Sequence, residues 1–440
     1  QRGGAFGFRD QLQDVLPLFA LHPKLARRQI LLHASQQFLE GDVLQWWHPA
    51  ATGGTGLAAR NRASDPHLWL PYVTCRYVAQ TGDDAILDER TRFLEGPAIP
   101  AGAEGINFVP RPSREDASLY EHCCRAIDFT LSRIGAHGLP LLGSGDWNDG
   151  LSDFAEGGAG ESVWLALFLH DTLVHFAELA LAREGEAKTR SYRAHAQELR
   201  RHLAGMWHDD RYPRLVAGNG DWISWFDALM GSWPVLSGAV SFERGRQAAE
   251  AALGALERDH QVLLLTPYFG EHSPRVPGRI ADYPPGVREN GGQYSHGSSW
   301  LVDALVQLSD AARASGRLQL ADNLHHRAFE VWRKISPLDK VGPERFDNYG
   351  LAPHQQPADI YFGPGYEGRG GWSWYTGAAA RMLMAAHALL GIRLEDGELV
   401  VAPEAFAPDR ELHLRKLHYR GQEHGGERRH ALVEPAESDW

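Results

Sequence analysis

Apolar residues recur at a spacing of three or four positions along most of this 440-residue chain, and that spacing marks one face of an α-helix. In segment 163–181, Leu165, Leu169 and Phe176 fall on one broad apolar face, and Ser162 is suited to cap its N-terminus. About nine helices are expected, at residues 26–38, 68–78, 119–134, 163–181, 192–206, 244–256, 298–314, 318–335 and 374–390. The pattern therefore predicts a mainly α protein.

Signals for β-strands are few by comparison. Short apolar runs occur at 261–267, 398–402 and 412–419, and the last two are expected to form a terminal β-hairpin or sheet edge. Residues 421–440 are charged and weakly patterned, so we expect them to be frayed. Helix pairs joined by long loops rich in Gly and Trp favour an α/α barrel, whose loops at one end would form the pocket.

Composition and charge exclude several classes of protein. Apolar residues make up 43% of the chain, too many for a disordered protein. The 44 basic and 56 acidic residues give a net charge of −12, which argues against a nucleic-acid partner. No run of about 18 apolar residues occurs, so no membrane segment is expected. The start at Gln1 lacks signal-peptide features, and the chain is expected to be a piece of a longer protein.

The cysteine content points to a reducing environment. Cys75, Cys123 and Cys124 are too few for a disulfide framework and suit a reducing compartment or buried thiols. A cytoplasmic or cytosol-facing location is therefore expected. The 22 histidines form no His-Glu-x-x-His motif, and no Cys-x-x-Cys occurs, so we expect no metal site.

The loop with the most chemical character is Gly143-Ser144-Gly145-Asp146-Trp147-Asn148-Asp149-Gly150. Two carboxylates here flank an indole and an amide. A carboxyl group beside an indole can be kept protonated by desolvation, as a general acid requires. The alternative is a turn rich in Asp and Asn that caps the next helix.

Two further loops carry arginine and aspartate. In segment 7–14, Arg9 could clamp a phosphate or carboxylate and Asp14 could accept hydrogen bonds from sugar hydroxyls, or the two could form a surface pair. Segment 60–65, from Arg60 to Asp65, follows a Gly-rich run but lacks the Gly-Lys-Ser/Thr of a P-loop. It suits an anionic or polyhydroxyl ligand.

Two loops that lead into predicted helices could bind an anion. Segment 289–296 ends at His296, which could hold an anion together with the helix dipole or could simply face solvent. In segment 368–377, the Thr376 hydroxyl and the Gly377 N–H are candidate anion donors. Trp372 and Trp374 could stack on sugar rings or pack in the core.

Taken together, these loops resemble glycoside hydrolase family 94, which contains cellobiose and chitobiose phosphorylases and the phosphorylase domain of cyclic β-1,2-glucan synthases. The matching stretches run in family order, at residues 4–14, 36–49, 64–84, 118–164, 289–300 and 358–377. The motifs at 118–123, 135–140 and 160–164 look like the cyclic β-1,2-glucan synthase branch.

The resemblance implies an (α/α)6 barrel at residues 1–392 followed by a short C-terminal β segment at 393–440. The chain departs from the family pattern in three ways. We expect this chain to lack the N-terminal β-sandwich of the family, the C-terminal β-layer looks short after Leu412, and Pro66 stands where many relatives carry a second Asp after Asp65.

The resemblance also implies roles for individual residues. Asp149 would be the general acid. Arg9, Asp14 and Trp147 would hold the glycosyl residue, and Glu289 and Tyr294 would lie toward the acceptor sugar. His296, Thr376 and Gly377 would bind phosphate, with Arg9 close by. Arg60 and Asp65 belong to the remaining loop expected to contact the sugar.

The expected activity is reversible, inverting phosphorolysis of a β-linked gluco-oligosaccharide, β-1,2 by branch resemblance, to α-glucose 1-phosphate. Phosphate would be a co-substrate and no cofactor is expected. One alternative is an inverting hydrolase that uses Asp65 or Glu289 as the base. Another is a non-catalytic glucan-binding or length-control domain. The expected partners are the oligosaccharide, phosphate, and either a larger synthase or a second copy of the chain.

Overall fold

The computed structural model describes residues 4–51, 53–271, 273, 275, 277–373, 377–401, 417–419 and 422–424. Within these residues the α-helices are α1 (Phe8–Asp14), α2 (Leu18–Leu21), α3 (Pro23–Ala34), α4 (Trp69–Thr81), α5 (Leu119–Leu131), α6 (Val163–Glu184), α7 (Glu186–Ala204), α8 (Ala228–Leu236), α9 (Phe242–Leu256), α10 (Ser295–Ala314), α11 (Leu318–Ile335), α12 (Phe346–Tyr349) and α13 (Ala378–Leu389).

The described strands are short. They are β1 (Phe6–Gly7), β2 (Leu44–Pro49), β3 (Thr55–Asn61), β4 (Arg90–Glu95), β5 (Gly105–Phe108), β6 (Arg111–Ser118), β7 (Glu161–Ser162), β8 (Leu215–Val216), β9 (Trp222–Ile223), β10 (Phe226–Asp227), β11 (Leu265–Thr266), β12 (Gln293–Tyr294), β13 (Asp359–Ile360), β14 (Ile392–Glu395), β15 (Glu398–Val401), β16 (Leu417–Tyr419) and β17 (Gln422–His424).

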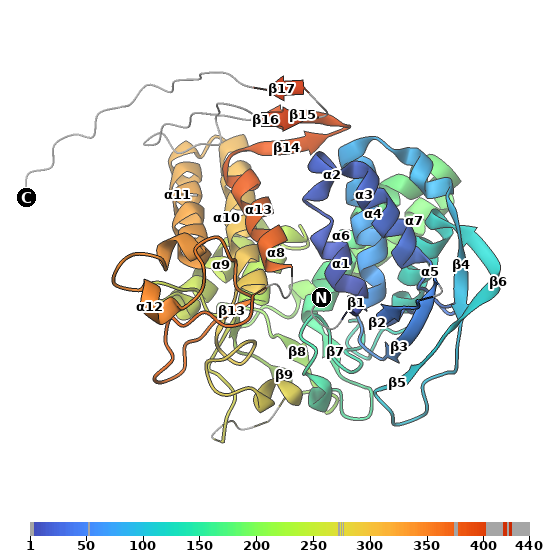
Figure 1. Ribbon diagram of the computed structural model, residues 1–440, viewed down its shortest axis with the longest axis horizontal. Coiled ribbons are helices and arrows are strands. Elements are labelled where there is room, and N and C mark those ends of the chain that lie inside the picture. The colour runs from blue at the N-terminus through green and yellow to red at the C-terminus, as the bar shows by residue number, and fades with distance from the viewer. Residues whose placement is uncertain are drawn as a thin grey trace, which may run out of the picture.

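The helices form two layers of neighbours. Helices α1, α4, α6, α8, α10 and α13 contact one another in that order, and α13 contacts α1. Helices α3 and α5 pack against α4, while α7, α9 and α11 pack against α6, α8 and α10. Figure 1 shows the long helices running side by side, with β14 and β15 across one end. The fold is therefore helical, as predicted, and the long helices are paired.

Each of the nine predicted helical segments corresponds to an observed helix, the last of them only over its described residues. The predicted cap is confirmed, because the Ser162 hydroxyl accepts the Leu165 N–H at 3.0 Å. The helices α1, α2, α8 and α12 were not predicted. Three of them are seven residues or shorter, and α8 contains Pro234, which normally ends a helical pattern.

The strand content was underestimated. A four-stranded sheet of order β1-β2-β3-β5 and the pair β4-β6 were not predicted. Register shifts interrupt the β2–β3 and β4–β6 pairs, so apolar and polar residues do not alternate cleanly along them.

The described part of the predicted terminal hairpin or sheet edge pairs differently from a single hairpin of 398–402 with 412–419. Strand β15 pairs with β14, and β16 pairs with β17. Strand β17 also lies inside the segment 421–440 that was expected to be frayed, and most of that segment lies outside the described residues.

Helix α6 is one of the most apolar helices of the described chain. It is long and apolar enough to cross a membrane by length and composition, yet 67% of its most apolar window is buried inside the protein. The three cysteines are buried free thiols.

Phe168 on α6 holds the aromatic core together. It is fully buried, and its ring centroid lies 4.6 Å from that of Trp69, 4.9 Å from Tyr72 and 5.3 Å from Trp233. These partners belong to α4 and α8, so one side chain joins three neighbouring helices.

Replacing this ring should be costly. We expect Phe168→Ala to lower the free energy of unfolding by about 3–5 kcal/mol, because it leaves a cavity among three helices. Urea denaturation would measure the change. Val174→Ala, at an exposed position of the same helix, is the control and should stay within about 0.5 kcal/mol of the parent. Equal effects of the two substitutions would contradict this account of the core.

Candidate active site

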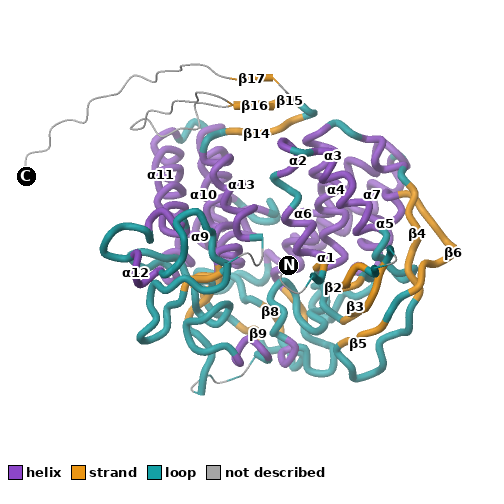
Figure 2. Tube along the Cα trace, in the orientation of Figure 1, coloured by secondary structure: helices purple, strands orange, loops and turns teal. Residues whose placement is uncertain are grey.

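The candidate residues come from segments far apart in the sequence. They lie on α1, on loop 143–150, at the start of α10 and directly before α13. Figure 2 shows that the loops gather at the end of the helices opposite β14. The ring of helices thus brings together positions separated by up to several hundred residues.

Arg9 lies at the centre of this cluster. Its Nη1 donates to Asp65 Oδ1 at 2.7 Å and to the main-chain carbonyl of Asp146 at 2.9 Å. Its Nη2 donates to Asp149 Oδ1 at 2.5 Å. Arg9 is only 8% exposed, so the predicted surface pair is excluded. One buried guanidinium joins α1, the segment before α4 and loop 143–150.

Burial and neighbouring charges shift the pKa values of Arg9 and Asp65 in opposite directions. Burial lowers the pKa of Arg9, but the charges of Asp149 and Asp65 outweigh that effect and hold the pKa well above its usual value. Burial raises the pKa of Asp65 to about 6, although Arg9 and the indole N–H of Trp69 both favour its charged form. Asp65 is fully buried, so it has no access to a water molecule from solvent.

Asp149 is the most accessible carboxyl group of the cluster. Its side chain is 48% exposed, and Gln45 Nε2 on β2 donates to its Oδ1 at 3.4 Å. It lines a cavity of about 280 Å³ together with polar groups that include Gln45, Asn61 and Arg279. A carboxyl group in this position can meet a ligand in the cavity while Arg9 fixes its orientation.

Three of the residues predicted near phosphate or sugar lie together beside Arg9. A Cβ placed on Gly377 would lie 3.1 Å from Asp14 Oδ1 and 3.1 Å from His296 Cε1. A larger residue here would therefore crowd Asp14 and His296. Thr376, also predicted to bind phosphate, lies outside the described residues.

His296 has an unused polar atom in this group. It is 3% exposed, and its Nε2 has no hydrogen-bond partner among the described residues. Burial, with the charges of Arg381 and Arg9, holds the pKa of His296 well below its usual value. His296 is therefore neutral at pH 7 and does not face solvent. A neutral imidazole with a free buried nitrogen is suited to bind a ligand oxygen.

Asp14 and its neighbour Asp10 form an acidic pair on α1. Burial and the charge of Asp10 raise the pKa of Asp14 to about 7. Burial also raises the pKa of Asp10, against the attraction of Arg9. Asp10 was not predicted as a site residue, although it directly follows Arg9 and its charge acts on both Arg9 and Asp14.

Trp147 is a core residue at the edge of the site. It is 7% exposed and packs against Tyr294, His296 and Trp300 with ring centroids 5.0–5.8 Å apart. Tyr294 is 6% exposed and lies in the same aromatic group. Trp147 and Tyr294 both lie in the cluster, and packing against other side chains buries most of their surface.

Glu289 lies within electrostatic reach of Asp149. Burial is the main cause that raises its pKa, and the Asp149 charge adds to it. Its Oε2 lies 3.6 Å from Arg288 Nε but accepts no hydrogen bond from any described residue. Glu289 is thus a partly buried carboxyl group with an unused oxygen.

Arg60 lines the same cavity as Asp149, but protein groups already bind its guanidinium. Its Nε and Nη2 donate to the two carboxylate oxygens of Asp42 at 2.7 and 2.6 Å, and its Nη1 donates to the Pro97 carbonyl. Arg60 lies at the end of strand β3, and residues 62–65 of the predicted segment follow the strand as a loop. The bidentate ion pair uses most of the donors that the sequence interpretation assigned to a ligand.

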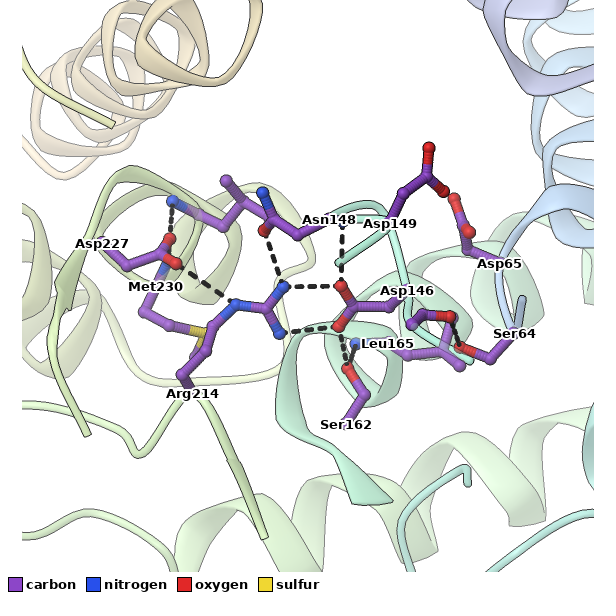
Figure 3. A network of polar contacts seen from close by, with 12 residues as sticks. Ser64, Asp65, Asp146, Asn148, Asp149, Ser162, Leu165, Arg214, Asp227 and Met230 are labelled. Atoms are coloured by element: carbon purple, nitrogen blue, oxygen red, sulfur yellow. Dashed lines mark hydrogen bonds and ion pairs between the residues drawn. The ribbon is translucent and has the colours of Figure 1, made fainter. Parts of the chain in front are cut away.

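A second buried arginine holds the inner side of loop 143–150 (Figure 3). Arg214 binds both carboxylate oxygens of Asp146 at 2.6 Å and the side-chain oxygen of Asn148 at 3.0 Å. Burial by itself would raise the pKa of Asp146, but the charge and hydrogen bonds of Arg214 have a larger effect in the opposite direction. The pKa of Asp146 is therefore lowered, which keeps the group ionised. No local pattern around Arg214 marks it in the sequence. Among the described residues, no group of three or more His, Cys, Asp or Glu side chains could hold a metal ion.

The raised pKa of Asp14 predicts a pH-dependent stability difference. The unfolded carboxyl group ionises near its usual pKa of 3.8 and the folded one near 7, so ionisation disfavours the folded state as the pH rises between these values. We expect Asp14→Asn to be more stable than the parent at pH 8 by a larger margin than at pH 4. Thermal unfolding without phosphate at both pH values measures this. A margin that is the same at both would contradict the raised pKa.

Comparison with known proteins identifies the family. The family described as the glycosyl hydrolase 94 superfamily, catalytic domain, matches residues 1–391. Cyclic β-(1,2)-glucan synthase NdvB of Rhizobium meliloti (strain 1021) is 39% identical over 420 residues, which cover 92% of this chain and 14% of that protein. Solabiose phosphorylase of Paenibacillus borealis is 29% identical over 397 residues, which cover 86% of this chain and 45% of that protein.

Solved structures agree at the level of the fold. A glycosidase variant in complex with glucose superposes with a TM-score of 0.53 at 15% identity, and the match covers 88% of each chain. The chain thus has a helical, glycosidase-type fold and spans less than half the length of the two relatives named above. On the evidence of the family match over residues 1–391, the chain belongs to the glycosyl hydrolase 94 superfamily.

Proposed function

We propose that this chain carries the site of an inverting glycoside phosphorylase, which cleaves a β-linked gluco-oligosaccharide with inorganic phosphate and releases α-glucose 1-phosphate. The observation that carries the proposal is the position of Arg9. It binds Asp149 directly, and its charge also acts on His296, whose imidazole ring lies beside Gly377. The proposed proton donor, Asp149, and the proposed anion site at His296 therefore both lie within reach of the buried Arg9 guanidinium.

The proton donor in this proposal is Asp149. As the half-exposed carboxyl group of the cavity, it would protonate the glycosidic oxygen as the bond to the anomeric carbon breaks. A bound phosphate would compete with Asp149 for the Arg9 guanidinium. That competition would release the carboxyl group to hold its proton when both substrates are present.

The anion site would supply the nucleophile. Arg9 contributes charge, the His296 nitrogen contributes a hydrogen bond, and Gly377 allows a close approach of the main chain. Phosphate is already anionic and nucleophilic, so its attack on the anomeric carbon needs no general base. The new bond forms on the face opposite to the leaving oxygen, which inverts β to α. Phosphate is the co-substrate, and the proposal needs no other cofactor.

The hydrolase alternative has lost one of its two candidate bases. Asp65 is fully buried and its carboxylate oxygens accept from Arg9 and Trp69, so it cannot activate a water molecule. Glu289 Oε2 accepts no hydrogen bond from a described residue, and the charge of Asp149 raises the pKa of Glu289 further after burial, which favours Glu289 as the base of a hydrolase. This second candidate function is separated from the first by its independence of phosphate.

The proposed substrate is a β-1,2-linked glucan. The support is the 39% identity to a protein named as a cyclic β-(1,2)-glucan synthase. The relative named as solabiose phosphorylase supports phosphorolysis rather than hydrolysis. We also propose that the contacting helices α1, α4, α6, α8, α10 and α13 form the inner layer of an (α/α)6 barrel, and that the chain works as part of a larger synthase.

The first test compares turnover with and without phosphate. We expect release of glucose 1-phosphate from β-1,2-gluco-oligosaccharides only when phosphate is present. Asp149→Asn should lower this rate about 10²–10⁴-fold, because a positioned acid contributes that much. Asp153→Asn, at an exposed position in the same region, is the matched control. Glucose release without phosphate would favour the hydrolase, and binding without any turnover would favour a glucan-binding domain.

The second test addresses the anion site. We expect His296→Asn to raise the phosphate concentration needed for half-maximal rate roughly 10-fold or more, since a hydrogen bond to an anion is lost. His325→Asn replaces another buried histidine, on α11, and should leave the phosphate requirement unchanged. An unaltered phosphate requirement in the His296 variant would remove this residue from the proposed site.

A further inference from the structure

We propose that Arg214 is a positioning residue that fixes the proton-donating carboxyl group of Asp149 without touching it. The inference rests on the proposed function and assigns a role to a residue outside the cavity. Arg214 precedes β8 and is completely buried. Figure 3 shows it on the side of Asp146 away from Asp65 and Asp149, the two carboxyl groups that Arg9 binds.

The loop alternates in the direction of its side chains. Asp146 and Asn148 bind the Arg214 guanidinium, at 2.6 Å and 3.0 Å. Trp147 instead packs against His296, and Asp149 binds Arg9. Neighbouring side chains of this loop point to opposite sides. The contacts that fix Asp146 and Asn148 therefore also determine where Trp147 and Asp149 lie. Arg214 therefore fixes the position of Asp149, the proposed proton donor.

The contacts of Arg214 are themselves anchored on both sides. Asp146 Oδ2 also accepts the Ser162 hydroxyl at 2.5 Å, and Ser162 caps α6. On the other side, Arg214 Nε donates to Asp227 Oδ2 at 3.2 Å, and Asp227 caps α8. The guanidinium thus ties the loop to the first turns of two helices of the inner layer. These helices are the rigid elements against which the loop is held.

Arg9 and Arg214 bind the same residue, Asp146, from opposite sides. Arg9 donates to the carboxylate of Asp149 and to the main-chain carbonyl of Asp146, while Arg214 binds the side chain of Asp146. Any shift of Asp146 would therefore move the Arg9–Asp149 pair as well. A misplacement of about 1 Å at a reacting group can cost roughly 10²-fold in rate.

Arg214→Lys is the variant that most directly tests this positioning role. Lysine keeps the positive charge that two buried aspartates require, but it lacks the planar fork that binds both oxygens of Asp146 together with Asn148. We expect the folded variant to lose roughly 10- to 100-fold in kcat on β-gluco-oligosaccharides with little change in KM. Leu199→Ala, in the buried face of the outer helix α7, is the control for lost stability. It should lower the unfolding temperature without lowering kcat.

A change of leaving group separates positioning from general damage. An aryl β-glucoside with a good leaving group needs little proton donation. Its phosphorolysis should therefore fall much less in Arg214→Lys than that of the oligosaccharide. Equal losses on both substrates, or an unchanged kcat on the oligosaccharide, would overturn the positioning role.

Amide hydrogen exchange of residues 143–150 gives a readout that needs no turnover. We expect faster exchange in Arg214→Lys than in the parent, and in Leu199→Ala no change confined to this loop. If the lysine variant does not fold, Asn148→Ala removes one of the loop contacts and should show the same pattern to a smaller degree. Unchanged exchange of the loop would overturn the inference. A parent protein without phosphate-dependent cleavage would instead refute the proposed function, and the exchange result would still decide the role of Arg214.

Discussion

The buried guanidinium of Arg9 is the interaction on which the rest of the site depends. It is bound by the side chains of Asp65 and Asp149 and by the carbonyl of Asp146. A buried charge is tolerated only when its partners and hydrogen bonds repay the loss of water. Here the partners come from three separate segments, so the ring of helices must close before the charge can be satisfied. Fold and site are therefore coupled through one side chain.

The two arginines around loop 143–150 serve different purposes. Arg9 binds Asp149, the carboxyl group that lines the cavity. Arg214 lies on the other side of the loop, where it binds Asp146, Asn148 and Asp227. The loop is thus held by a buried arginine on each side. Such an arrangement suits a carboxyl group that must keep its place while its proton is transferred.

The proposed anion site combines a neutral histidine with an aspartate whose pKa is raised. His296 stays uncharged because it is buried near Arg381 and Arg9, and Asp14 holds its proton up to about pH 7 because it is buried beside Asp10. An anion would therefore meet hydrogen-bond donors and one strong cation rather than competing carboxylates. This balance favours a small, highly charged ligand over a second sugar at this position.

Several features were readable from the sequence because they depend on short-range patterns. Helical periodicity located the long helices such as α6 and α11, and Ser162 marked a cap that the structure confirms. The motif loops identified Asp149, Arg9, His296 and Gly377 as candidates, and these residues do lie in one cluster. Resemblance among several loops also indicated the family, which the match over residues 1–391 confirms.

Other features depended on contacts between distant segments, which no local pattern records. Arg60 was expected at the sugar, yet Asp42 on a neighbouring segment binds its guanidinium. Arg214 has no motif around it and gains its role only because α6, α8 and loop 143–150 meet at its side chain. The sequence by itself determined which segments are helical and which residue types are chemically able to act. Only the tertiary structure decided which charges pair, because burial and partner choice arise when the ring of helices closes.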